Sequence, residues 1–169
     1  YENAIKVTRT LYTTRAVTKV IGFAGGTISA TAADGTVYTL VIPADSLRQV
    51  TRITMTPVTK LDGLPFGNGS DVTVDLQPSG LLFDVPATLS IAPATPIPDG
   101  EQILYGYSDD TLVFAEPALD ARGIVVVVPH FSGYGVAKGL MGDVEEVRKQ
   151  IGGSAEQRIY SEIRAVMQA

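Results

Sequence analysis

The sequence predicts a mainly β fold, an antiparallel β-sandwich with a short α-helical extension at its C-terminal end. Short runs rich in valine, isoleucine, threonine and tyrosine recur from residue 5 to residue 137. Turn residues separate them about every 8–12 positions, a spacing typical of sandwiches and barrels. Asp34-Gly35 is a strong hairpin signal between two such runs. After Gly139 the apolar residues change to helical spacing.

We expect roughly eight to ten short strands, drawn from eleven candidate segments in this region. In one of them Val72, Val74 and Leu76 alternate with Thr73 and Asp75, so this strand is predicted to bury only one face. The candidate strand segments are 5–8, 17–21, 27–30, 37–42, 52–58, 72–76, 88–92, 103–107, 111–114, 124–128 and 134–137.

The segments between the strands divide the chain further. Residues 46–49 are predicted to form a helical turn, and residues 59–71, rich in glycine, proline and asparagine, a loop. We therefore expect an N-terminal strand or linker over 1–19, the sandwich over 20–139 and a helical extension over 140–169.

The C-terminal extension is predicted to contain two helices, at about residues 141–151 and 154–168. A pair of glycines separates them, and Ser154 with Gln157 matches a capping box. Their apolar sides pack on the sandwich or on each other, or they form an arm that docks onto a partner or another copy. The apolar residues at helical spacing are Val144, Val147 and Ile151, then Ile159, Ile163 and Val166.

The composition excludes several classes of function. The 169 residues are 45% hydrophobic and 18% charged, which excludes a disordered chain. A net charge of -5 without a basic cluster argues against a nucleic-acid partner. The absence of cysteine excludes disulfides, thiolate catalysis and zinc–thiolate sites. No apolar run approaches the roughly 18 residues of a transmembrane segment. The chain begins at Tyr1 without a signal-peptide pattern, so we expect a mature chain or a fragment.

His130-Phe131-Ser132 is the strongest candidate site. It contains the only histidine of the chain and follows the apolar run Ile124–Val128. Strand alternation would place His130 and Ser132 on one face, about 6–7 Å apart at Cα. Gly133 would permit a distorted turn at the same bond. The Ser132 hydroxyl could then attack the Phe131 carbonyl, given a base and stored backbone strain.

Several stretches together resemble one family, the ZU-five module of ankyrins, zonula occludens proteins and netrin receptors, in its bacterial surface and secreted versions. The resemblance covers about residues 20–137 and implies a β-sandwich. Some relatives, PIDD among them, cleave themselves within a His-Phe-Ser segment, which implies Ser132 as nucleophile and His130 as its base. The stretches are Gly25–Ser29, Asp34-Gly35, Tyr38–Leu47, Thr51–Val58, Leu76–Ile91, Leu104–Tyr107 and Pro129–Val136.

The expected function is a non-catalytic structural or protein-interaction module of a larger bacterial envelope or secreted protein. It would bind a protein partner or neighbouring domains of the same chain, and we expect no cofactor and no metal. In this interpretation the His-Phe-Ser segment only ends a strand and buries Phe131. One alternative is a self-cleaving module that cuts between Phe131 and Ser132. Another is a homo-oligomeric assembly unit that exchanges its N-terminal strand or C-terminal helices.

Three weaker hypotheses remain. Ser132 and His130 could serve a turnover hydrolase, although no nucleophile-elbow motif occurs. Two groups of side chains could form binding sites, and each is more commonly structural. Asp62, Asn68 and Asp71 could bind calcium through their oxygens, and Tyr105, Tyr107 and Phe114 could line a surface for a sugar or peptide.

Overall fold

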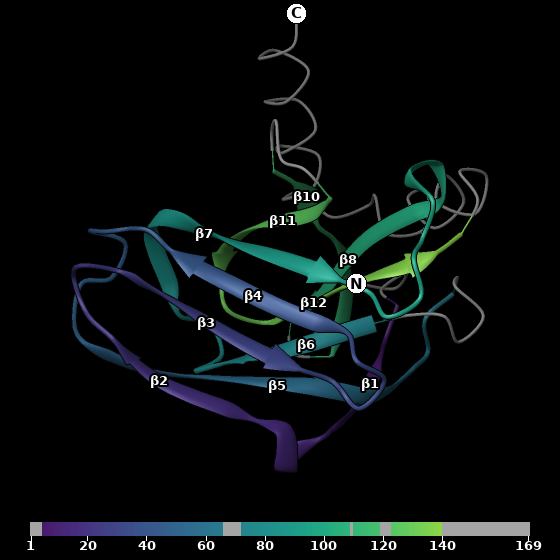
Figure 1. Ribbon diagram of the computed structural model, residues 1–169, viewed down its shortest axis with the longest axis horizontal. Helices are drawn as coiled ribbons and strands as arrows, with labels where there is room; N and C mark the ends of the chain where they lie inside the picture. Colours follow the sequence, from purple (N-terminus) through teal and green to yellow (C-terminus); the bar gives the residue numbers. More distant parts are fainter. Residues whose placement is uncertain (1–4, 66–71, 109, 119–122, 140–169) are drawn as a thin grey trace, which may run out of the picture.

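Where the structure describes the chain, the fold is built from two antiparallel sheets and almost no helix (Figure 1). This computed structural model describes residues 5–65, 72–108, 110–118 and 123–139. The mainly β prediction is confirmed. The described helical elements are two short 3-10 turns, η1 (Thr13–Arg15) and η2 (Asp99–Glu101). The two helices predicted within 140–169 lie outside the described residues.

Seven strands form the larger sheet and five form the smaller sheet. The larger sheet has the order β1 (Thr8–Leu11), β5 (Thr51–Asp62), β6 (Val72–Gln77), β12 (Gly133–Lys138), β8 (Gln102–Ser108) and β9 (Thr111–Phe114), and β2 (Val17–Ile21) also pairs with β5. The smaller sheet has the order β10 (Glu116–Pro117), β11 (Ile124–His130), β7 (Leu82–Ala92), β4 (Val37–Ile42) and β3 (Gly26–Thr31).

The first hydrophobic core joins the two sheets. Inward-facing residues of the smaller sheet, such as Leu40 and Leu89, belong to the same buried cluster as Ile53, Val74 and Leu76 of the larger sheet. Strand alternation explains which side chains enter this cluster, because every second residue of a strand points to the same face. The apolar positions of the sequence therefore fix the inner face of both sheets.

The second hydrophobic core lies on the other face of the larger sheet. It contains Tyr105, Tyr107, Leu112 and two residues that precede β1, Ile5 and Val7. The larger sheet is thus buried on both faces where these residues cover it. This corrects the prediction that β6 is half-buried.

In β6 the residues expected to face solvent are buried instead. Thr73 and Asp75 are each 1% exposed, as closely buried as Val74 and Leu76 on the opposite face. The larger sheet curls, and the N-terminal residues cover its second face. Local alternation could not predict this burial, because the covering residues come from a distant part of the chain.

The N-terminal residues 5–11, which we call the closing segment, connect the two ends of the larger sheet. Residues 8–11 pair with β5 as strand β1. Just before them, the Val7 N–H donates to the Asp110 carbonyl at 2.7 Å, and the Leu112 N–H donates to the Ile5 carbonyl at 2.8 Å. The closing segment therefore pairs with β5 at one end and with β9 at the other.

Other sequence predictions can be compared element by element. The hairpin at Asp34-Gly35 is confirmed, with β3 and β4 paired and Gly35 at φ 97°. The loop expected from residue 59 is wrong in its start, because pairing with β1 extends β5 to Asp62. The helical turn expected at 46–49 is also wrong, and there the Ser46 carbonyl accepts a hydrogen bond from Asp84 of β7.

Candidate functional site

The His-Phe-Ser segment lies where the chain crosses from one sheet to the other. His130 is the last residue of β11 in the smaller sheet and pairs with Leu82 of β7. Three residues later, Gly133 begins β12 in the larger sheet. Phe131 and Ser132 therefore form the whole connection between the two sheets at this point.

Phe131 anchors the crossover in the first core. Its side chain is 1% exposed, and its ring meets Phe83 edge-on with centroids 5.0 Å apart. Both of its backbone groups are bonded to the turn that follows β6. The Phe131 N–H donates to the Leu81 carbonyl at 2.8 Å, and the Phe131 carbonyl accepts from the Gly80 N–H at 2.9 Å. Phe131 is thus tied into the scaffold by ring and backbone.

Ser132 presents a buried hydroxyl. Its backbone carbonyl accepts a hydrogen bond from the Leu76 N–H at 3.0 Å. Its side chain is 6% exposed, and Oγ has no hydrogen-bond partner in the part of the chain that the structure describes. A buried hydroxyl in this condition costs on the order of 1–3 kcal/mol. An unpartnered polar group beside the predicted cleavage bond is the most notable feature of the segment.

The predicted base and nucleophile are neighbours in sequence without a hydrogen bond between them. Ser132 Oγ accepts and donates none, so the His130 ring does not hold it. The backbone carbonyl of His130 accepts a hydrogen bond from the Tyr134 hydroxyl at 2.8 Å. The partial burial of His130 and this bond fit the end of a strand.

The backbone around the predicted cleavage bond is ordinary in its φ angles. None of residues 130–133 has a φ angle in the left-handed region. Gly133 does not adopt the left-handed conformation that its missing side chain would permit. Gly133 is a strand residue, and a Cβ atom built on it would lie 1.9 Å from the Tyr107 ring. Glycine is required here because the Tyr107 ring occupies the space of a side chain.

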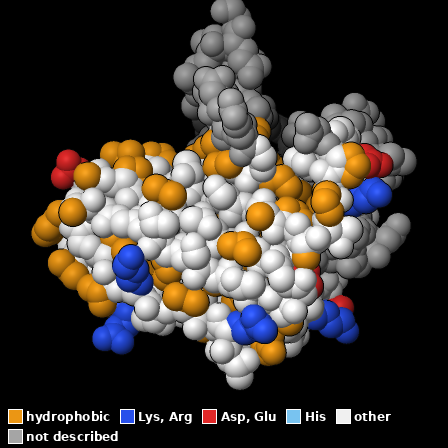
Figure 2. Space-filling view, in the orientation of Figure 1, with side chains coloured by type: hydrophobic (Ala, Val, Ile, Leu, Met, Phe, Trp, Pro, Cys, Tyr) orange, Lys and Arg blue, Asp and Glu red, His pale blue; other side chains and the backbone are white. Residues whose placement is uncertain are grey.

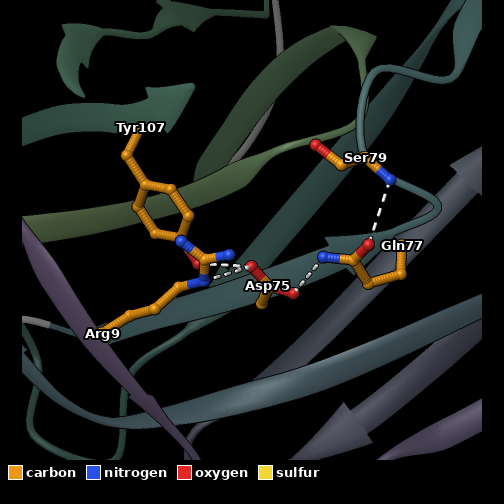
Figure 3. A network of polar contacts seen from close by, with 5 residues as sticks. All are labelled: Arg9, Asp75, Gln77, Ser79 and Tyr107. Carbon is orange, nitrogen blue, oxygen red and sulfur yellow. Dashed lines mark hydrogen bonds and ion pairs between the residues drawn. The ribbon is translucent and has the colours of Figure 1, made fainter. Parts of the chain in front are cut away.

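A polar network around Asp75 is the feature that the sequence did not reveal (Figure 3). The Tyr107 hydroxyl donates to Asp75 Oδ1 at 2.6 Å, and the Gln77 amide donates to Asp75 Oδ2 at 2.8 Å. Arg9 Nε lies 3.2 Å from Oδ1, and its guanidinium lies over the Tyr107 ring at 5.0 Å from the centroid. Gln77 in turn accepts from the Ser79 N–H at 3.0 Å.

This network, the Asp75 network, keeps one buried negative charge satisfied. Burial, and then the charge of the Asp75 carboxylate and the hydrogen bond to it, raise the pKa of Tyr107 far above its ordinary value. Tyr107 therefore stays protonated and remains a donor. In the sequence, Asp75 occupies a position of the strand pattern that is expected to face solvent. Arg9 lies 66 positions before it. Only the curl of the sheet brings them together.

The aromatic surface considered for Tyr105, Tyr107 and Phe114 does not form. Tyr105 is 0% and Tyr107 is 2% exposed, and Phe114 packs partly buried against the same second core. The Tyr105 hydroxyl shares a hydrogen bond with Thr73 Oγ1. The structural alternative is correct for the two tyrosines.

Of the three residues of the calcium hypothesis, the structure describes only Asp62, which lies in an exposed ion pair. Asp62 Oδ1 lies 3.5 Å from Lys60 Nζ, while Asn68 and Asp71 lie outside the described residues. Over the described ranges, no three or more His, Asp or Glu side chains gather in a way that could hold a metal ion. The same ranges contain no helix with the length and apolar character needed to cross a membrane.

Comparison with known proteins adds no assignment. No family model matches the chain, and no curated protein matches it either. The ZU-five resemblance therefore depends on the sequence motifs alone. The geometry of the described residues carries the remaining argument about function.

Proposed function

We propose that the chain is a non-catalytic structural or protein-interaction module, a ZU-five-like β-sandwich within a larger bacterial envelope or secreted protein. The shared first core of the two sheets supports the sandwich. The tight attachment of Phe131 to the core and to the turn after β6 supports a scaffold role for the His-Phe-Ser segment. The motif order of the sequence supports the family.

The observation that carries the interaction role is the part of the smaller sheet's outer face where β3, β4, β7 and β11 pair, which has no charged side chain of its own. The paired strands β3, β4, β7 and β11 present serine, threonine and valine side chains there, in aligned rows. Figure 2 shows this side with charged side chains mostly toward the edges of the view. The residues of the outer face are Thr27, Ser29, Thr31, Val37, Thr39, Val41, Thr88, Ser90, Val125 and Val127.

An outer face of this composition suits contact with protein. Solvent-facing positions of an antiparallel sheet are commonly polar and charged, whereas β-branched residues are common on covered faces. Val37 is 37% and Val41 is 42% exposed. Covering these side chains would remove apolar surface from water without burying a charge. The outer face thus fits a protein partner or a neighbouring domain.

Site-specific photocrosslinking tests this role. A photoreactive residue replaces Val41 on the outer face, and a matched control replaces Lys60, whose side chain is 69% exposed on the larger sheet. We expect one protein to crosslink to the chain labelled at position 41 and not to the chain labelled at position 60. Adding excess unlabelled chain should reduce this crosslink. The Val41→Lys chain should compete roughly tenfold less well, since it adds a charge to the contact. Equal crosslinking at both positions would contradict the proposal.

The second candidate function is self-cleavage between Phe131 and Ser132. It is favoured by the unpartnered Ser132 hydroxyl and by the Gly80 N–H, which already donates to the Phe131 carbonyl oxygen. In this reaction Ser132 Oγ bonds to the Phe131 carbonyl carbon, the C–N bond breaks, and the Ser132 nitrogen gains the hydroxyl proton. Water then hydrolyses the ester.

A matched pair of serine variants tests the second candidate on denaturing gels. Ser46 and Ser132 both have a buried Oγ without a partner among the described residues. Self-cleavage requires two bands from the wild type and Ser46→Ala chains and one band from Ser132→Ala. One full-length band from all three after long incubation would remove this candidate.

A further inference from the structure

We propose that the larger sheet contains a strand-acceptor site between β5 and β9, and that the closing segment of a second copy of this chain fills it by exchange. This inference deepens the assembly alternative and does not depend on the outer face. In the single chain the site is filled by the chain's own residues 5–11. Exchange would leave each contact the same and change only which chain supplies the segment.

The backbone bonds make the site a strand acceptor. Two main-chain hydrogen bonds join the closing segment to β9, Val7 N–H to Asp110 and Leu112 N–H to Ile5. The antiparallel pairing of residues 8–11 with β5 continues the segment on the other side. An incoming strand would gain these main-chain bonds whatever its sequence, as in other cases of strand addition.

Side chains add selectivity for an apolar–basic–apolar pattern. Ile5 and Val7 enter the second core. Between them Lys6 points outward, where Nζ lies 3.1 Å from Asp110 Oδ1 and 3.0 Å from Thr111 Oγ1. The pair with Lys6 lowers the pKa of Asp110, so this carboxylate stays charged at neutral pH. A strand with an acidic residue at position 6 would meet a like charge.

Arg9 supplies the second and stricter requirement. Its guanidinium reaches Asp75, which is 1% exposed, and covers the Tyr107 ring. Without the closing segment, the buried carboxylate would lose its cation and the apolar residues of the second core would lose their cover. The site therefore favours a strand with a cation at this position.

We assign a second copy of the chain as the occupant because its closing segment has a basic residue at position 6 and a cation at position 9. The closing segment is held only between β5 and β9 among the strands, and segments of this kind can exchange between identical chains. It is connected to β2 through η1, which has no buried residues. Each copy carries Lys6 and Arg9 on the segment and Asp75 and Asp110 in the acceptor, so the charges are complementary between copies.

One residue pair reports which chain fills the site. Lys6 and Thr111 are bridge partners between the two hydrogen bonds to β9. In antiparallel strands such a pair has Cα atoms about 4.5 Å apart, within the range of a disulfide. The chain has no cysteine of its own. Two single-cysteine chains can therefore form a mixed 6–111 disulfide only by meeting at this site or by random collision.

The experiment mixes full-length Lys6→Cys and isotopically labelled Thr111→Cys chains at high concentration. The mixture is warmed to just below the unfolding midpoint, cooled and mildly oxidised. A control mixture pairs Lys6→Cys with Leu82→Cys, whose side chain is 72% exposed in the wild type, far from the acceptor in strand order. We expect the 6–111 disulfide to exceed the 6–82 disulfide by roughly tenfold, because exchange raises the effective concentration of the pair.

A second comparison tests recognition. Adding Arg9→Glu to the Lys6→Cys chain should lower the 6–111 yield to that of the control, while Arg9→Lys should retain most of it. Val41→Lys on the outer face should leave the yield unchanged, which separates this inference from the proposed function. Equal 6–111 and 6–82 yields would overturn the strand exchange. A 6–111 yield unaffected by Arg9→Glu would overturn the assigned selectivity.

Discussion

Asp75 brings a negative charge into the second core, where an unpaired carboxylate would be costly. Tyr107, Gln77 and Arg9 each place a donor on it, and they come from β8, β6 and β1. The network therefore ties the closing segment to two central strands of the larger sheet. We interpret the network as a structural site, since both carboxylate oxygens of Asp75 are already bound by the other residues of the network.

Loss of Arg9 should destabilise the fold more than loss of an exposed arginine. Arg9→Ala leaves Asp75 buried without its cation, and we expect the free energy of unfolding to fall by about 1–3 kcal/mol. The matched control is Arg48→Ala. Arg48 pairs with Asp84 at 3.0 Å, but its side chain is 85% exposed, so the change should stay within about 0.5 kcal/mol. Equal losses in urea unfolding would contradict the assigned role of Arg9.

Tyr107 should make stability depend on alkaline pH. Its pKa in the folded chain is raised above the ordinary 10.0, so the folded chain keeps a proton that the unfolded chain releases. The contribution is fully present below pH 10 and is lost as the pH rises above this value. Above pH 10 we expect the urea midpoint of the wild-type chain to fall as the pH rises. In Tyr107→Phe the midpoint should fall less steeply with pH. Identical slopes for both chains would contradict the burial of Tyr107.

Gly133 should tolerate no side chain. In Gly133→Ala the added Cβ would overlap the Tyr107 ring, and we expect a loss of more than about 3 kcal/mol. Gly100→Ala is the matched control, because a Cβ at Gly100 meets nothing within 4 Å. Its change should stay within about 0.5 kcal/mol. Thermal unfolding of the two variants checks the prediction, and a stable Gly133→Ala chain would show that the ring lies elsewhere.

At the scale of elements, the closing segment matters most. It forms only four residues of regular strand, β1, yet it pairs with both β5 and β9 and covers the second core. The apolar residues Ile5 and Val7 do indicate a strand in the sequence. Their backbone partners, Leu112 and Asp110, are about a hundred positions away, and no local pattern identifies them.

A disulfide across the closing segment should stabilise the chain. In the double variant Lys6→Cys, Thr111→Cys, the bond would close a long loop at a pair that is already adjacent. We expect the free energy of unfolding to rise by about 2–4 kcal/mol on oxidation. The measurement compares the oxidised and reduced forms of the same variant, with each single variant as control. No gain, with the bond formed within one chain, would contradict the position of the segment.

Strand positions were largely predictable, and strand lengths were less so. The segments 17–21 and 37–42 were predicted with the bounds that β2 and β4 have, since alternation and flanking turns are local signals. β5 continues to Asp62 because β1 pairs with it, and β7 begins at Leu82, ahead of the predicted residue 88. Both extensions depend on partners that are distant in sequence.

At the scale of the whole molecule, the His-Phe-Ser segment connects two sheets. The sequence identified it as the end of one strand and the approach to another, which is correct. It could not show that β11 and β12 belong to different sheets. This crossover explains why Phe131 is buried and why its backbone is bonded to the turn after β6. The unpartnered Ser132 hydroxyl was likewise beyond any sequence pattern.

The intact mass of the purified chain after prolonged incubation at neutral pH tests the central claim most directly. A scaffold role for the His-Phe-Ser segment predicts one species at the full 17.8 kDa. Its mass should stay unchanged after denaturation, which releases any fragments that the fold holds together. Two fragments that part between Phe131 and Ser132 would contradict the non-catalytic module and establish self-cleavage in its place.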